Sequence, residues 1–72
     1  MVNVGRLRGR IVEQKLTVGK IAELTGIDRS TFYRKLGSNG EGISIREADL
    51  IVKHLGLSRD EAMAIFFHQF VA

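Results

Sequence analysis

Five residues near the middle of the sequence carry side chains that could recognise nucleic acid bases. The guanidinium groups of Arg29 and Arg34 present forked donors that match O6 and N7 of guanine. Ser30 and Thr31 carry hydroxyls that can donate to or accept from several bases. Arg29 and Tyr33 are four residues apart and share one face of a helix, with Arg34 beside that face. These residue types predict an exposed polar face that binds an anionic partner.

Other polar and basic residues suit a phosphate backbone, where contacts position a protein without reading sequence. The candidates are Arg10, Thr17, Lys20, Lys35, Ser38 and Asn39. Residues 1–37 hold eight lysines and arginines against three acids, whereas residues 38–72 hold three against five. The two parts carry net charges of +5 and −2, so a polyanion is expected to meet the first part. The alternative is that these charges only solvate helices and that Tyr33 packs its ring on the domain.

Helices must position these side chains, because the sequence has no proline and no sustained alternation of β-branched residues. Four helix starts share a hydrophobic residue, a capping side chain and a second apolar residue five positions after the first. They are Leu16-Thr17 with Ile21, Ile27-Asp28 with Phe32, Ile43-Ser44 with Ala48, and Leu57-Ser58 with Ala62. Glu47 and Glu61 add capping boxes to the last two of these starts.

Glycines are expected to end three of the helices. Gly26, Gly37 and Gly56 each fall where a helix would finish in a left-handed residue, which glycine adopts at little cost. The second helix is therefore predicted at about residues 17–25, and the helix that carries the polar face at about residues 28–37.

The whole chain, residues 1–72, is predicted to be one all-α domain with five helices around one core. The first helix is expected from about Asn3 to Lys15. The core candidates are Leu7, Ile11, Ile21, Leu24, Ile27, Phe32, Leu36, Ile45, Ala48, Ile51, Val52, Leu55, Leu57, Ala62, Ile65 and Phe66. Near the end, Phe67, Phe70 and Val71 are expected to cap the domain edge or to form a dimer or partner contact.

Catalysis and metal binding find little support in the sequence. There is no cysteine, and His54 and His68 have no acidic ligands at suitable spacing, so no metal site, cofactor or enzyme is expected. The loop GSNGEG lacks the preceding strand and following GK[ST] of a nucleotide-binding loop. No signal peptide or membrane-length apolar run is recognised, so we expect a protein of the host cell cytoplasm without membrane contact.

The stretch LTVGKIAELTGIDRSTFYRKL, residues 16–37 with the following glycine, resembles the Cro/CI (XRE) helix-turn-helix family. The shared features are a small Ala22, Gly26 in the turn, Ile27 after it and an inward Phe32. The chain is most similar to small regulators of temperate phages and prophages of Gram-positive bacteria. The resemblance implies a lambda-repressor-like fold in which the start of helix 17–25 contacts phosphates.

The same resemblance implies that helix 28–37 is the recognition helix and enters the major groove of operator DNA. Its groove-facing positions would be Arg29, Ser30, Tyr33 and Arg34, with Thr31 beside them. The expected function is that of a phage-type transcriptional regulator that binds double-stranded operator DNA and helps to set the choice between lysis and lysogeny. A homodimer on the DNA is a further expectation.

One pair of residues departs from the family pattern. Family members commonly carry glutamine and polar neighbours where this chain has Val18 and Gly19. Either the backbone N–H groups there, with Thr17 and Lys20, still bind a phosphate, or a small apolar step forms a surface for another protein. The second interpretation predicts a different function. The chain would be a modulator of repression, or antirepressor, that binds a partner repressor and blocks its DNA-reading surface.

Overall fold

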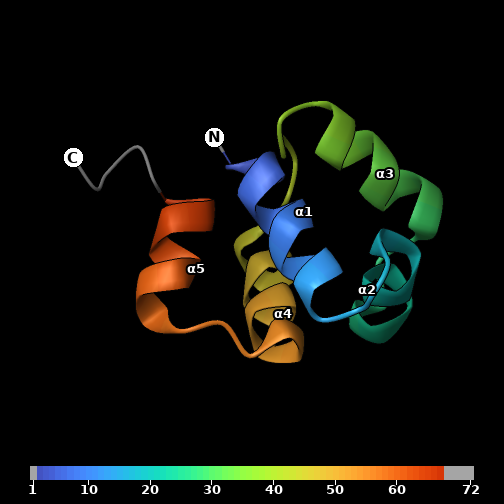
Figure 1. Cartoon of the computed structure of the whole chain (residues 1–72). Coiled ribbons are helices and arrows are strands. Elements are labelled where there is room, and N and C mark those ends of the chain that lie inside the picture. Colours follow the sequence, from blue (N-terminus) through green and yellow to red (C-terminus); the bar gives the residue numbers. More distant parts are fainter. Residues whose placement is uncertain (1, 68–72) are drawn as a thin grey trace.

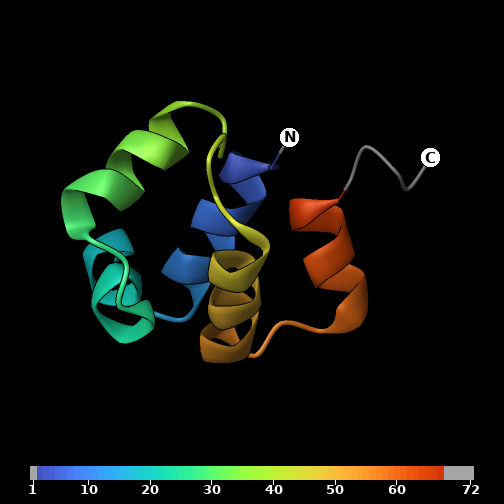
Figure 2. The ribbon, with the colours of Figure 1, turned by 180° about the vertical axis from the view of Figure 1, so that it is seen from behind.

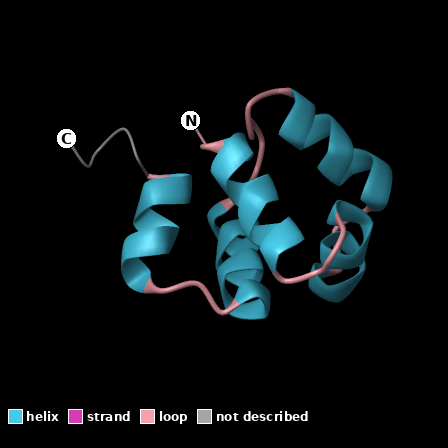
Figure 3. Cartoon of the chain, in the orientation of Figure 1, coloured by secondary structure: helices cyan, strands magenta, loops and turns pink. Residues whose placement is uncertain are grey.

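A computed structural model describes residues 2–67, which form five α-helices and no strand (Figures 1 and 3). The helices are α1 (Val4–Glu13), α2 (Val18–Thr25), α3 (Arg29–Gly37), α4 (Ile45–Leu55) and α5 (Arg59–Phe66). The all-α, five-helix prediction is therefore confirmed for the described residues. None of these helices has the length and apolar character needed to cross a bilayer.

Each helix begins at a side chain that accepts a backbone N–H three residues further on. The caps are Asn3, Thr17, Asp28, Ser44 and Ser58. Ser44 and Ser58 form the predicted reciprocal capping boxes with Glu47 and Glu61. All four helix starts predicted from the sequence are thus confirmed. They could be predicted because a cap depends only on residues close to it in sequence.

Two of the three glycine stops are confirmed. Gly26 and Gly56 adopt left-handed conformations with φ of 77° and 62°. The prediction for Gly37 was wrong, because α3 includes this residue and the cap is Ser38, whose N–H and hydroxyl both bond to the carbonyl of Arg34. The left-handed residues come later in that loop.

The end of α1 uses a left-handed residue that is not a glycine. Lys15 has φ of 58°. Its N–H bonds to the carbonyl of Val12 at 2.9 Å, and the N–H of Leu16 bonds to that of Ile11 at 3.1 Å. These two bonds form a Schellman motif of the kind that usually contains glycine. Asn39, in the loop after α3, also has positive φ, at 60°.

Helix α2 packs against α1, α3 and α4, and α5 packs against α1 (Figure 2). In both views α3 and α5 lie at opposite ends of the molecule. One hydrophobic core joins the helices. Its buried residues are Leu7, Ile11, Val18, Ile21, Ala22, Phe32, Leu36, Ala48, Ile51, Leu55, Leu57, Ile65 and Phe66.

Two core predictions were wrong. Leu24 is exposed, because it lies roughly a third of a turn around α2 from the face formed by Val18, Ile21 and Ala22. Ile45 is 81% exposed, because it is the first residue of α4 and lies roughly a quarter of a turn around that helix from the face formed by Ala48, Ile51 and Leu55. Three further candidates are only half-buried at the edge of the core, namely Ile27, Val52 and Ala62.

The backbone before α1 connects two distant parts of the fold. The N–H of Val2 donates to the carbonyl of Asn39, and the N–H of Asn3 donates to that of Ile65 at 2.7 Å. Gly40 is buried against the side chain of Val2, so no larger residue fits there without a shift. These contacts join the loop after α3 to α1 and to the last turn of α5.

At the chain end, the prediction that Ile65 and Phe66 belong to the core is confirmed. Ile65 and Phe66 are buried in the core, whereas Phe67 is partly exposed on the groove between α4 and α5. The sequence analysis also considered His68, Phe70 and Val71, which lie outside the described residues.

Candidate nucleic-acid interface

Helix α3 is held in place by its two inward residues and by its cap. Phe32 and Leu36 are buried in the core. The carboxylate of Asp28 accepts the backbone N–H of Thr31 at 3.0 Å and its hydroxyl at 3.1 Å. These hydrogen bonds lower the pKa of Asp28 below its ordinary value, so the cap is charged at neutral pH. The helix therefore has a fixed inner side.

The outer side of α3 carries four of the five predicted recognition residues. Arg29, Ser30, Tyr33 and Arg34 are all exposed, with Tyr33 at 43%. Among residues 2–67, neither arginine has a carboxylate oxygen within 4.0 Å. The donors of both guanidinium groups are therefore available to a ligand.

The fifth predicted residue is placed differently. Thr31 is half-buried, and its hydroxyl is used by the cap of α3. A hydroxyl that donates to Asp28 has no second proton to donate to a base. Thr31 therefore serves to fix the start of α3 rather than to extend its outer face.

Lys35, a predicted phosphate ligand, is already paired within the fold. Its Nζ lies 2.9 and 3.1 Å from the two carboxylate oxygens of Glu47, and both side chains are partly buried. Burial raises the pKa of Glu47, but the N–H of Ser44 and the Lys35 ammonium lower it more, so the net shift is downward. The pair links α3 to the first turn of α4.

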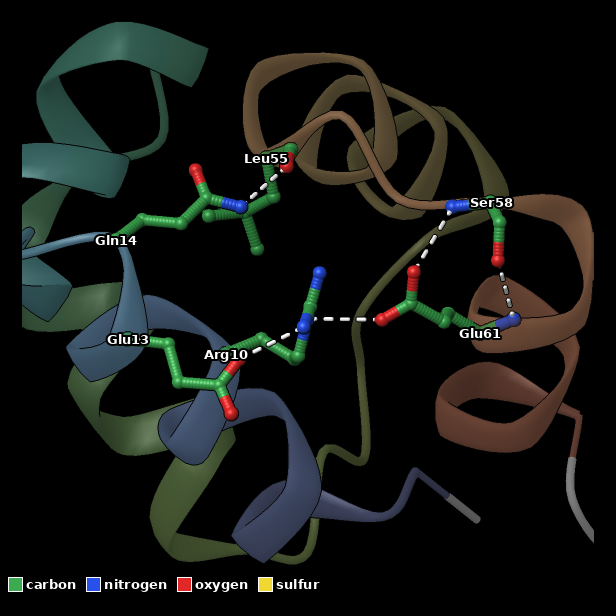
Figure 4. Close-up of polar contacts among 6 residues, drawn as sticks. All are labelled: Arg10, Glu13, Gln14, Leu55, Ser58 and Glu61. Atoms are coloured by element: carbon green, nitrogen blue, oxygen red, sulfur yellow. Dashed lines mark hydrogen bonds and ion pairs between the residues drawn. The ribbon is translucent and has the colours of Figure 1, made fainter.

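Arg10, another predicted phosphate ligand, also has carboxylate partners. Its Nη1 donates to Glu13 at 2.7 Å, and its Nε lies 2.9 Å from a carboxylate oxygen of Glu61 (Figure 4). The Nε–H is not aligned for a hydrogen bond, so the contact with Glu61 is an ion pair only. Beside it, the amide of Gln14 donates to the carbonyl of Leu55 at the end of α4. This cluster ties α1 to α4 and α5 and lies away from α3.

The remaining phosphate candidates lie at the start of α2 and in the loop after α3. Thr17 caps α2 by accepting the N–H of Lys20, whose ammonium lies 3.5 Å from Glu23 on the surface. Such an exposed pair is weak and leaves the lysine free to exchange partners. Asn39 and Ser38 are exposed, although the hydroxyl of Ser38 donates to the carbonyl of Arg34.

The structure explains the unusual Val18 and Gly19. Val18 is only 9% exposed and belongs to the core, so it forms no apolar step on the surface. A Cβ at Gly19 would lie 2.8 Å from Cζ of Arg29 and 2.9 Å from its Nε and Nη2. The guanidinium of Arg29 thus packs on the backbone of α2 at Gly19, a contact that the sequence analysis missed.

Comparison with models of protein families, with curated proteins and with solved structures gives no match. The resemblance of residues 16–37 to the Cro/CI family therefore rests on the sequence pattern. Among residues 2–67 there is also no group of three histidine or acidic side chains placed to hold a metal ion.

Proposed function

We propose that this chain binds double-stranded DNA, with the outer side of α3 in the major groove and the start of α2 on the phosphate backbone. In this proposal α2 and α3 act as a helix-turn-helix, and the chain is a transcriptional regulator of the phage type. The sequence resemblance supports this assignment. The position of α3 at one end of the molecule supports it too, because a duplex can approach without displacing another described helix.

One observation carries the proposal most strongly. On α3 the half-buried cation, Lys35, is paired with Glu47, whereas the exposed Arg29 and Arg34 have no carboxylate oxygen within 4.0 Å among residues 2–67. Unpaired guanidinium forks on a rigid helix suit guanine edges and phosphates. Ser30 and Tyr33 lie on the same outer side and complete a polar surface.

In this account the residues divide into two groups. Arg34, with Ser30 and Tyr33, contacts base edges and gives sequence preference. Lys20 and Thr17 at the start of α2 contact phosphates and give orientation. A homodimer would double the contacts on a two-fold operator. Regulation of the choice between lysis and lysogeny belongs to the proposal through the family resemblance.

The alternative function, a modulator that binds a partner repressor, uses the same exposed face of α3. Its main support was the apolar step at Val18, and that side chain is buried in the core. Val18 therefore gives no support to contact with a repressor.

Selection from a pool of randomised duplexes tests the proposal without knowledge of the operator. The full chain is expected to enrich a defined sequence motif. Arg34→Ala should lose the preference at one position of that motif, with a discrimination loss of about 1–3 kcal/mol. Arg59→Ala is the matched control, because Arg59 is an exposed arginine on α5, at the far end of the molecule from α3. Failure to retain any duplex above background would overturn the proposal.

A further inference from the structure

We infer that Gly19 is a positioning residue, which seats the guanidinium of Arg29 against α2 so that Arg29 contacts a DNA phosphate rather than a base. This inference rests on the proposed function and deepens it. It changes the role expected for Arg29 from the sequence, and it gives a reason for the glycine.

The contact has a defined geometry. The three guanidinium atoms nearest to a Cβ at Gly19 are almost equally distant, with Cζ at 2.8 Å and Nε and Nη2 at 2.9 Å. Within the plane of the group, the point equally far from these three atoms lies much closer to them, so a point 2.8–2.9 Å from all three lies over the face of the group. The face of the guanidinium therefore packs on Gly19, and its N–H groups point outward along the edges, where a ligand can reach them.

The backbone gives no other reason for a glycine at this position. Gly19 does not adopt the positive φ seen at Gly26 and Gly56, and it lies in the first turn of α2. Glycine lowers helix propensity there relative to alanine. The Arg29 guanidinium occupies the space that a Cβ at position 19 would need, so only glycine leaves room for it.

The contact with Gly19 means that the Arg29 side chain extends from α3 towards α2. Its side chain leaves the first residue of α3 and reaches the helix start that carries Thr17 and Lys20. Arg34, more than one turn further along α3, is exposed. A guanidinium fork held at the start of α2 matches two oxygens of one phosphodiester group. Val18 cannot supply such donors, so Arg29 supplies them.

A double-mutant cycle on Gly19 and Arg29 tests this inference with a short duplex of mixed sequence and with the selected site. Gly19→Ala displaces only the far end of a flexible side chain, so the thermal midpoint should stay constant or rise. The affinity of the Gly19→Ala variant for both duplexes should fall about tenfold, as expected for the loss of a charge-assisted bidentate contact. In the Arg29→Ala background the same change should have no further effect.

Gly9→Ala is the matched control, because Gly9 is a helical glycine in α1 with no atom within 4 Å of its Cβ position. It should leave DNA binding unchanged. Arg29→Ala should lower the slope of log affinity against log salt by about one and leave the selected motif intact.

The possible outcomes are distinct. If the wild-type chain binds no duplex, the proposed function fails and the inference falls with it. If the wild-type chain binds but Gly19→Ala binds equally well, or its effect adds to that of Arg29→Ala, only the positioning role is overturned. If Arg29→Ala changes the selected motif, Arg29 reads a base and the phosphate assignment is wrong.

Discussion

The ammonium of Lys35 lies 2.9 and 3.1 Å from the two carboxylate oxygens of Glu47, which also accepts the N–H of Ser44. Glu47 therefore fixes α3 and the start of α4 with one carboxylate. The pair is shielded from solvent more than the other salt bridges among residues 2–67. A partly buried pair with further hydrogen bonds is sensitive to the loss of either partner.

Glu47→Gln should lower the free energy of unfolding by about 1–2 kcal/mol, because it removes the ionic contact while an amide can still close the capping box. Urea denaturation at neutral pH measures the change. Asp49→Asn is the control, since the Asp49–Lys53 pair on α4 is largely exposed, and its loss should cost less than about 0.5 kcal/mol. Equal effects of the two substitutions would show that the Lys35 contact adds no stability.

The same carboxylate predicts how stability depends on pH. The pKa of Glu47 is lowered from its ordinary value of 4.5, so the folded chain releases this proton more readily than the unfolded chain. Its contribution is complete above pH 4.5 and is lost as pH falls through the lowered pKa. The pKa of Asp28 is also lowered. As pH falls through this range, the free energy of unfolding should therefore decrease less in Glu47→Gln than in the wild-type chain. An identical loss would contradict the assignment.

Lys15→Gly should stabilise the chain by about 0.5–1 kcal/mol, because Lys15 holds φ of 58° at the end of α1 and glycine adopts this conformation without strain. Thermal or urea unfolding tests the direction. The converse change, Gly26→Ala at φ of 77°, should cost about 1 kcal/mol. If Lys15→Gly instead lowers the free energy of unfolding, the lysine side chain makes a contact that stabilises the fold by more than the left-handed backbone costs.

Val18→Gln restores the residue type that the family pattern favours, yet it should destabilise the chain by about 1–3 kcal/mol, because it places an amide in the core. Val12→Gln is the matched control on α1, where the side chain is 70% exposed and the change should be within about 0.5 kcal/mol. Unchanged stability of Val18→Gln would show that position 18 faces solvent.

The helix starts were predictable because capping is local. Ser44 and Glu47, for example, are three residues apart, and the box they form needs no other part of the chain. The partner of Glu47 was not predictable, since Lys35 lies twelve residues earlier and the pair forms only when α3 and α4 pack. Lys35 was accordingly assigned to a phosphate from its charge alone.

The burial of Val18 was not predicted, although the spacing of apolar residues in α2 indicates it. It precedes Ile21 by three residues and Ala22 by four, which is the spacing of a buried helix face, and the structure buries it. Because family members carry polar residues at this position, Val18 was predicted to lie on the surface instead. The contact between Gly19 and Arg29 depends on how α2 and α3 cross and on the arginine side-chain conformation, neither of which a sequence pattern specifies.

A gel-shift titration of the full chain on the DNA that flanks its own gene, at two salt concentrations, tests whether α3 binds DNA directly. A discrete complex should form, and its affinity should fall steeply with salt, by about 0.9 log units per phosphate contact for each tenfold rise in salt concentration. Arg34→Ala should relax the site preference, and Arg59→Ala should leave it intact. If a complex forms only when a second regulator is added, or if the chain removes that regulator from the DNA, direct binding by α3 is contradicted.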